Sequence, residues 1–246
     1  MPLQEAFFGT CVSAGYPETY DHNHTYATGV GPIPMNNSNG MRMSTAMTYI
    51  NPNRHRMNLT IRANVQVQRI LFEGRRATGV EVESGGERFV VEGDLIVLSA
   101  GASPQLLMLS GVGPKAHLKE MGIPVVHDLA GVGHNLRDHP IVAVRVKVKD
   151  DFPLDATAPR METVLRYAAA GSDLRNDMQI LPSSFSTPLG GAPLEEKGIR
   201  FSRLMELAIS SGEVKLTSTD PSVQPYIDVG TSKNARTQNG CERLSE

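Results

Sequence analysis

The chain has 246 residues, of which 40% are hydrophobic and 20% are charged, and its formal net charge at pH 7 is −2. This composition is typical of a globular protein of one or two domains, and no apolar run is long enough to predict a transmembrane helix. The charge is nearly balanced and forms no basic stripe, which excludes the electrostatic pattern of a nucleic-acid-binding protein. We therefore expect a small molecule or another protein as the partner, with no nucleic acid and no membrane segment; the oligomeric state is left open.

Cysteine usage and the first residues bear on the compartment. Cys11 and Cys241 lie near opposite ends of the chain and are too few for a disulfide framework or a thiolate metal site. The first residues lack the basic start and apolar core of a signal peptide. By default these features predict a reducing, cytoplasmic location, unless the natural N-terminus lies further upstream. His22 and His24 alternate like a metal-binding pair, but no third ligand is near, so we interpret them as solvated loop histidines and expect no metal.

The first 92 residues divide into an irregular part and a regular part. Residues 1–40 contain many turn formers and little periodicity, which predicts a long loop that covers a site or lies across a partner domain. A short helix is expected over 41–49. Near-alternating apolar residues then predict three strands, with the hairpin signal Gly85-Gly86 between the second and the third. We expect an antiparallel β-meander here.

The next stretch has the pattern of a strand, a glycine turn and a helix. Residues 95–98 form a continuous apolar run, which is typical of a parallel strand buried on both faces. Gly101 follows, and a helix is predicted from Ser103 to the stop at Gly111. In such an arrangement the glycine turn and the N-terminus of the helix can bind a nucleotide. The Gly-Val-Gly-Pro run that begins at Gly111 follows a helix and not a strand, so we interpret it as a turn into a second helix and not as a dinucleotide fingerprint.

The C-terminal half has weaker signals. Its alternating and apolar segments predict four strands and one helix. The strands are expected over 141–148, 177–181, 204–209 and 213–217, and the helix over 161–170. The tail over 231–246 is polar and aperiodic, which predicts no core-forming element.

Three ordered motifs carry a family resemblance. Residues 103–114 (SPQLLMLSGVGP), 122–126 (GIPVV) and 131–140 (GVGHNLRDHP) closely resemble the glucose-methanol-choline (GMC) oxidoreductases. Upstream, residues 40–44 (GMRMS) and the short run Asn58-Leu-Thr60 look like the same family. The resemblance covers about residues 10–140 well, and it weakens toward the C-terminal side.

The resemblance implies a mixed α/β (α+β) fold. Residues 1–140 would form part of an FAD-binding domain of the two-dinucleotide-binding flavoprotein type, with the antiparallel β-meander and a covering loop. Residues 141–230 would form part of a substrate domain built on an antiparallel sheet, and 231–246 would be an irregular tail.

The resemblance also implies an FAD-dependent enzyme that oxidises the CH–OH group of an alcohol. Hydride passes to the flavin while a histidine takes the hydroxyl proton. By analogy the backbone of Val67 contacts the adenine, Gly101 and Ala102 allow the main chain near the cofactor, and Asn135 and Asp138 lie in a loop that helps to close the site. Each has a structural alternative: a core position of the meander, a turn glycine, or loop residues that bond their own backbone.

Departures from the family pattern limit these expectations. There is no strand-linked Gly-x-Gly-x-x-Gly and no histidine after His139, so no catalytic residue is assigned to this chain. The turn between Ala102 and Ser103 is two residues shorter than in most relatives. His139 is interpreted as structural. We expect an internal fragment of a longer protein that is inactive alone; the alternatives are a non-catalytic remnant or interaction protein, and an FAD-containing lyase of the same family.

The alcohol and the use of oxygen are not indicated by any motif. Oxidase and dehydrogenase differ in local access to the flavin, which no residue pattern here encodes. The candidates for substrate selection lie in the C-terminal half and are Met178, Ile180, Phe185 and Met205.

Overall fold

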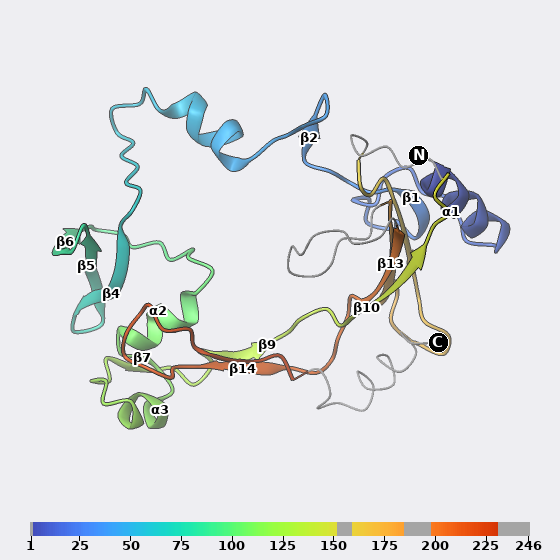
Figure 1. Ribbon diagram of the computed structural model, residues 1–246. Helices are drawn as coiled ribbons and strands as arrows, with labels where there is room; N and C mark the ends of the chain where they lie inside the picture. Colours follow the sequence, from blue (N-terminus) through green and yellow to red (C-terminus); the bar gives the residue numbers. More distant parts are fainter. Residues whose placement is uncertain (1, 152–158, 185–197, 231–246) are drawn as a thin grey trace. The chain divides into compact units, whose positions relative to one another are not determined.

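The computed structural model describes residues 2–151, 159–184 and 198–230 (Figure 1). These residues form two compact units, each assembled from separated parts of the chain. Unit 1 joins Met1–Thr48 with Asp138–Ile209, and unit 2 joins Tyr49–Arg137 with Ser210–Thr231. Phe185, one of the residues considered for substrate selection, Cys241 and the 231–246 tail lie outside the described residues.

Unit 1 is built on a five-stranded sheet in which every neighbouring pair is antiparallel. In spatial order its strands are β1 (Gly29–Pro32), β11 (Thr163–Tyr167), β12 (Met178–Ser183), β13 (Gly198–Met205) and β10 (Ile141–Lys147). The strands predicted near 141–148 and 177–181 are confirmed. The strand predicted over 204–209 is wrong for residues 206–209, because β13 spans Gly198–Met205 and ends there. The helix predicted over 161–170 is wrong, because β11 pairs on both sides, with β1 and β12, and these ladders fix an extended backbone.

One face of this sheet is covered by helix α1 (Pro2–Ser13). Cys11 of the helix packs against Val30 and Leu165 of the strands, and all three are buried. The loop predicted over 1–40 is therefore wrong for its first third. Pro2 is compatible with a first helical turn, and Gly15 adopts a φ of +89° just beyond the last turn.

Gln4 ties the same helix to the sheet by its side-chain amide. The amide is 2% exposed, and its NH2 group donates to the Pro182 carbonyl oxygen and to Ser184 Oγ, both at 3.2 Å. Its Oε1 accepts from the Thr163 hydroxyl at 2.6 Å and from the Thr163 N–H at 3.0 Å, and also from the Glu162 N–H. Because Gln4 lies 178 residues before Pro182, these bonds close unit 1 over a long loop of chain.

Short elements link unit 1 to unit 2. A two-stranded hairpin of β2 (Asn37–Ser38) and β3 (Met41–Arg42) is followed by a π-helix over Ala46–Ile50 and a 3-10 helix over Asn51–Asn53. The helix predicted over 41–49 is thus only partly correct, since its first two residues form a strand.

Unit 2 contains the predicted β-meander. Its strands are β4 (Gln66–Glu73), β5 (Arg76–Ser84) and β6 (Glu87–Glu92), in the order β4-β5-β6. Gly85 and Gly86 both have positive φ and form the hairpin turn between β5 and β6. The meander and its turn are therefore confirmed.

The rest of unit 2 packs around two short helices. Helix α2 spans Ser103–Leu109 and α3 spans Lys115–Glu120, and Met108 and Leu118 form a buried cluster with Leu216. The other strands of the unit are β7 (Val112–Gly113), β8 (His127–Asp128), β9 (His134–Leu136), β14 (Gly212–Lys215) and β15 (Tyr226–Asp228). Both predicted helices are confirmed. The turn between them contains β7, which pairs in parallel with β8.

The buried strand predicted at 95–98 is wrong. These residues form no strand, and the side chains of Leu95 and Val97 are 81% and 79% exposed. A strand needs a neighbour to which its N–H and C=O groups can bond, and no described residue pairs with this segment.

The compact units cross the sequence-based division at residue 140. Strand β1 of the first segment pairs with β11, and β14 pairs with β9. The assignment of 1–140 to cofactor and 141–230 to substrate is therefore a prediction about roles, which the arrangement of units does not test.

Candidate functional site

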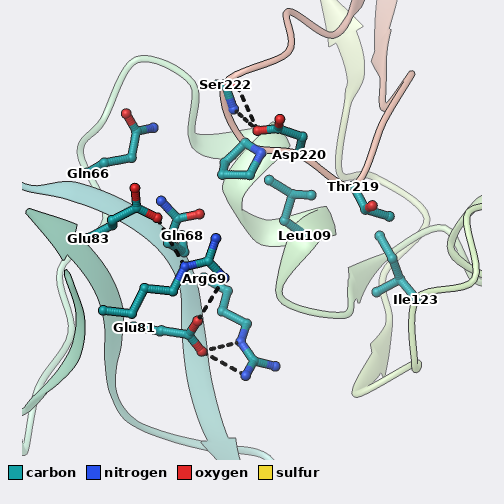
Figure 2. Close-up of a pocket in the computed structure, with 12 residues that line it drawn as sticks. Gln66, Gln68, Arg69, Glu81, Glu83, Leu109, Ile123, Thr219, Asp220 and Ser222 are labelled. Carbon is teal, nitrogen blue, oxygen red and sulfur yellow. Dashed lines mark hydrogen bonds and ion pairs between the residues drawn. The ribbon is translucent and has the colours of Figure 1, made fainter. Parts of the chain in front are cut away.

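Unit 2 contains a polar cavity of about 680 Å³ beside the meander (Figure 2). Side chains of β4 and β5 form one wall, and the end of α2 with residues 219–222 forms the other. Its lining comprises Gln66, Gln68, Arg69, Glu81, Glu83, Arg88, Leu109, Ile123, Thr219, Asp220, Pro221 and Ser222. The volume lies in the range of small-molecule sites.

Most charges in this cavity are paired with one another. Arg69 Nη2 lies 2.7 Å from Glu81 Oε2, and Arg88 Nε lies 3.0 Å from Glu83 Oε2 (Figure 2). Asp220 accepts hydrogen bonds from the hydroxyl and the backbone N–H of Ser222, and these bonds lower the pKa of its carboxyl. The cavity therefore offers paired charges and the Gln66 and Gln68 amides, and no isolated charge stands out.

Val67, the predicted adenine contact, lies in β4 next to this cavity. It pairs with Val82, and the register shifts between Val67 and Arg69. Because β4 is an edge strand, alternate backbone groups on its outer side have no ladder partner. One of these groups, the Ile70 N–H, donates to Ser110 Oγ at 2.8 Å. The contact of Val67 with adenine stays a prediction.

Gly101 and Ala102 lie in the turn before α2, and both are exposed. Gly101 has a φ of +66°, and a Cβ there would meet no atom within 4 Å. Glycine is therefore favoured by the backbone conformation and not by crowding. Ala102 is the N-cap residue of α2, a position that was predicted for Ser103. The role of both residues at a cofactor remains a prediction.

Asn135 and Asp138, the two predicted loop residues, belong to different units. Asn135 lies in β9 with a φ of +60°, and it is exposed. Asp138 Oδ1 accepts a hydrogen bond from the backbone N–H of His139 at 2.8 Å. The His139 ring lies 3.3 Å from Glu206 Oε2. No bond between Asn135 and Asp138 brings them together, and their part in closing a site stays a prediction.

Unit 1 contains a second cavity, of about 650 Å³, that the sequence did not predict. It lies between residues 22–27 and the face of the sheet formed by Val164, Arg166 and Gln179. The other lining residues are Ile33, Pro34, Arg175, Asn176, Glu206 and Leu207.

His22 is the most buried titratable group of this cavity, with 6% of its surface exposed. The interpretation of His22 as a solvated loop residue is therefore wrong; His24 is exposed, as expected. Within the described residues neither ring nitrogen of His22 reaches a partner with hydrogen-bonding geometry. Burial and the Arg166 guanidinium lower the pKa of the ring, and the Val164 backbone and Asp21 act in the opposite direction.

The part of the chain that the structure describes has neither a metal-binding cluster nor a membrane-spanning helix. There, no three side chains of His, Cys, Asp or Glu are grouped so that they could hold a metal ion. No described helix has the length and hydropathy needed to cross a membrane.

Comparison with known proteins decides the family. The family model for GMC oxidoreductases matches residues 1–141, which is more than half of the chain. The chain belongs to the GMC oxidoreductase family. This GMC chain is 34% identical over 230 residues to an uncharacterised GMC-type oxidoreductase of Rhodococcus erythropolis, which covers 92% of the chain and 45% of the relative. It is 46% identical over 141 residues to an oxygen-dependent choline dehydrogenase of Photobacterium profundum, covering 56% of the chain and 25% of that enzyme.

Solved structures support the fold. The pyridoxine 4-oxidase of Mesorbium loti superposes with a TM-score of 0.86 at 26% identity, over 100% of this chain and 50% of the oxidase. A formate oxidase superposes with a TM-score of 0.84 at 22% identity, which shows the fold alone. The mixed α/β fold of a GMC flavoenzyme is thereby confirmed. The chain spans about half the length of the relatives that it matches over its whole extent.

The GMC oxidoreductases are FAD-dependent enzymes, so the family and cofactor class predicted from the motifs are confirmed. The motifs did not indicate the unit 1 cavity, because its side chains lie outside them, in segments assigned to a loop, a helix and two separate strands. Alternation along β11 would have placed Val164 and Arg166 on one face, had 163–167 been predicted as a strand.

Proposed function

We propose that this GMC chain is the part of a flavoenzyme that holds the adenosine end of FAD in unit 2 and an alcohol in unit 1. The reaction is oxidation of the alcohol CH–OH group. The observation that carries the proposal is the family match over residues 1–141, which includes Val67, Gly101 and the 131–140 motif. When bound, FAD accepts the hydride from the alcohol carbon.

The residues of this chain serve binding and positioning in this proposal. The outer edge of β4 at Val67 offers backbone donors and acceptors to adenine. The Gly101 turn lets the main chain approach the cofactor, and Asn135 and Asp138 contribute to the loops around it. No catalytic base is assigned among these 246 residues; the base belongs to the whole enzyme. Whether oxygen or another acceptor reoxidises the flavin is a property of the whole enzyme as well.

Flavin binding by the purified chain tests the cofactor part of this proposal. We expect a visible flavin band that stays with the protein through gel filtration after addition of FAD, and we expect ADP to displace it, since ADP carries the adenosine diphosphate part of FAD without the flavin. Val67→Ala keeps the backbone groups and should bind FAD as the parent does. Val67→Pro removes one backbone N–H and should weaken binding by at least about tenfold.

The matched control is Val90→Pro in β6, the other edge strand of the meander. It introduces the same residue at the opposite edge and should leave FAD binding unchanged. Circular dichroism and thermal melting show whether each variant is folded. A folded chain that binds neither FAD nor ADP would overturn the proposed role of unit 2 and favour a non-catalytic remnant.

A further inference from the structure

The lining of the unit 1 cavity is largely polar and contains two guanidinium groups, those of Arg166 and Arg175. Strand register places Arg166 of β11 directly opposite Gln179 of β12, and both line the cavity. Leu165 points to the other face, where it packs against Cys11 of α1. The cavity therefore occupies the face of the sheet that α1 does not cover.

The charges of this cavity are unequal. Arg166 and Arg175 are positively charged at all physiological pH values, and Glu206 is the acidic residue of the lining. Glu206 Oε2 lies 3.3 Å from Nδ1 of His139, so one oxygen of the only carboxylate among the described residues of this lining is directed at the His139 ring. Among the lining residues that the structure describes, the two guanidinium groups outnumber the one carboxylate, which favours an anionic ligand; the Asp21 carboxylate acts on His22 from outside the lining.

Both guanidinium groups are held in place by the loop that forms the opposite wall. Arg166 Nη1 donates to the His22 carbonyl oxygen at 3.1 Å, and this bond uses one of its five N–H donors. Arg175 Nη2 donates to the Tyr26 carbonyl oxygen, and its Cζ lies 5.7 Å from the centroid of the Tyr26 ring. Such fixed guanidinium groups lose little side-chain freedom when they bind a carboxylate.

The His22 ring adds an independent observation that points to a ligand. It is buried in the cavity wall, and neither of its nitrogens has a partner with full hydrogen-bond geometry among the described residues; the Val164 backbone lies near enough to raise the ring pKa but does not meet that geometry. A buried polar group without a hydrogen bond costs about 1–3 kcal/mol of stability. A ligand that forms this hydrogen bond removes the cost and therefore binds more tightly. A hydroxyl or carboxylate oxygen has the required chemistry.

We infer that the unit 1 cavity binds an alcohol that also carries an anionic group, with Arg166 and Arg175 facing the anion and the His22 ring bonded to a ligand oxygen. A short hydroxy acid is the simplest such molecule. The inference rests on the proposed function for the alcohol, and it names the substrate class. It sets this chain apart from the choline dehydrogenases that it resembles, whose named substrate is a cation.

Calorimetric titration of the chain with three small probes at low ionic strength tests this inference. Glycolate is the anionic alcohol, ethylene glycol is its neutral counterpart and choline is the cationic alcohol. We expect glycolate to bind at least about tenfold more tightly than either of the others, and added salt to weaken glycolate alone. A ring-proton NMR signal of His22 that shifts only with glycolate would locate the ligand.

Two arginine variants with the same loss of charge provide the control. Arg166→Gln should weaken glycolate binding by at least about tenfold. Arg166→Lys should bind glycolate more tightly than Arg166→Gln but less tightly than the parent, because lysine keeps the positive charge and lacks the planar guanidinium group. Arg203→Gln should stay within about twofold of the parent, since Arg203 pairs with Ile180 on the face that carries Leu165 and donates to the Tyr167 hydroxyl at 2.9 Å.

The outcomes separate this inference from the proposed function. Equal affinity for glycolate and ethylene glycol, equal effects of Arg166→Gln and Arg203→Gln, or no glycolate binding by the folded chain would each overturn the anionic substrate class. The FAD and ADP titrations report on unit 2, so their failure with intact glycolate binding would overturn the cofactor role and leave the anion site standing.

Discussion

The two units differ in how far they complete their own sheets. In unit 1 all five strands find antiparallel neighbours within the described residues, although the partners come from both ends of the chain. In unit 2 the strands of the meander and of the β9-β14-β15 sheet also pair with one another. The apolar residues 95–98, in contrast, pair with no described strand, and Leu95 and Val97 are exposed. An apolar run therefore does not form a strand by itself; it also needs a neighbouring strand in the right register.

The largest effects are expected from methionines at the centre of each unit. Met108 of unit 2 and Met178 of unit 1 are almost completely buried, and truncation of either to alanine should cost about 2–5 kcal/mol. Each variant should lose hydrogen-exchange protection in its own unit only. Loss of protection in both units from either change would show that the division into two units does not describe stability.

A smaller effect is expected from the buried amide that closes unit 1. Gln4→Ala removes the Oε1 atom that accepts hydrogen bonds from the Thr163 N–H and hydroxyl and from the Glu162 N–H, which should destabilise unit 1 by about 1–3 kcal/mol. Urea unfolding, monitored at Tyr16 or Tyr167 of unit 1, measures this cost. An unchanged transition would mean that α1 is held by its apolar contacts alone.

The His22 pKa predicts a pH dependence confined to unit 1. Because the folded state holds this pKa below the ordinary value of 6.5, the unfolded chain takes up a proton first as the pH falls. The stabilising contribution is complete above pH 6.5 and is lost below it, by at most about 1.4 kcal/mol per pH unit. His22→Gln should flatten this part of the stability curve; an equally steep curve in the variant would assign the effect to other groups.

The smallest effect is expected at residues 95–98, which the sequence predicted to be a buried strand. Leu95→Ala should change the stability of the chain by no more than about 0.5 kcal/mol, because the side chain is exposed. Leu118→Ala, at a buried site of the same unit, should cost about 2–5 kcal/mol and serves as the matched comparison. Similar melting temperatures for the two variants would mean that residues 95–98 are buried in solution.

The sequence predicted the parts of the fold that depend on local signals. The meander follows from period-two alternation and the paired glycines, and α2 and α3 follow from Pro104, Pro114 and the stops at Gly111 and Gly122. Residues 163–167 were misassigned because a short run with apolar residues at 164, 165 and 167 fits a helix as well as a strand. Only the distant partners β1 and β12 decide between the two.

The candidate sites show the same limit. The family motifs indicated residues near the meander and the Gly101 turn, because motifs are contiguous in sequence. The unit 1 cavity joins His22 to Arg166 and Arg175, which follow it by more than a hundred residues and meet it only through the pairing of β1 with β11. No spacing rule in one sequence brings such residues together, so the charge of this cavity was found only in the structure.

The interleaved connectivity of the two units has a consequence for how the protein is made. During synthesis the first segment of unit 1 emerges early, but β11 and the acceptor of Gln4 at Pro182 follow only after all of β4 to β9. The ribosome must also complete β14 before β9 of unit 2 gains its partner. Unit 1 can therefore complete its sheet only after most of unit 2 has been translated, and a cut between residues 137 and 138 would divide both units and not separate them.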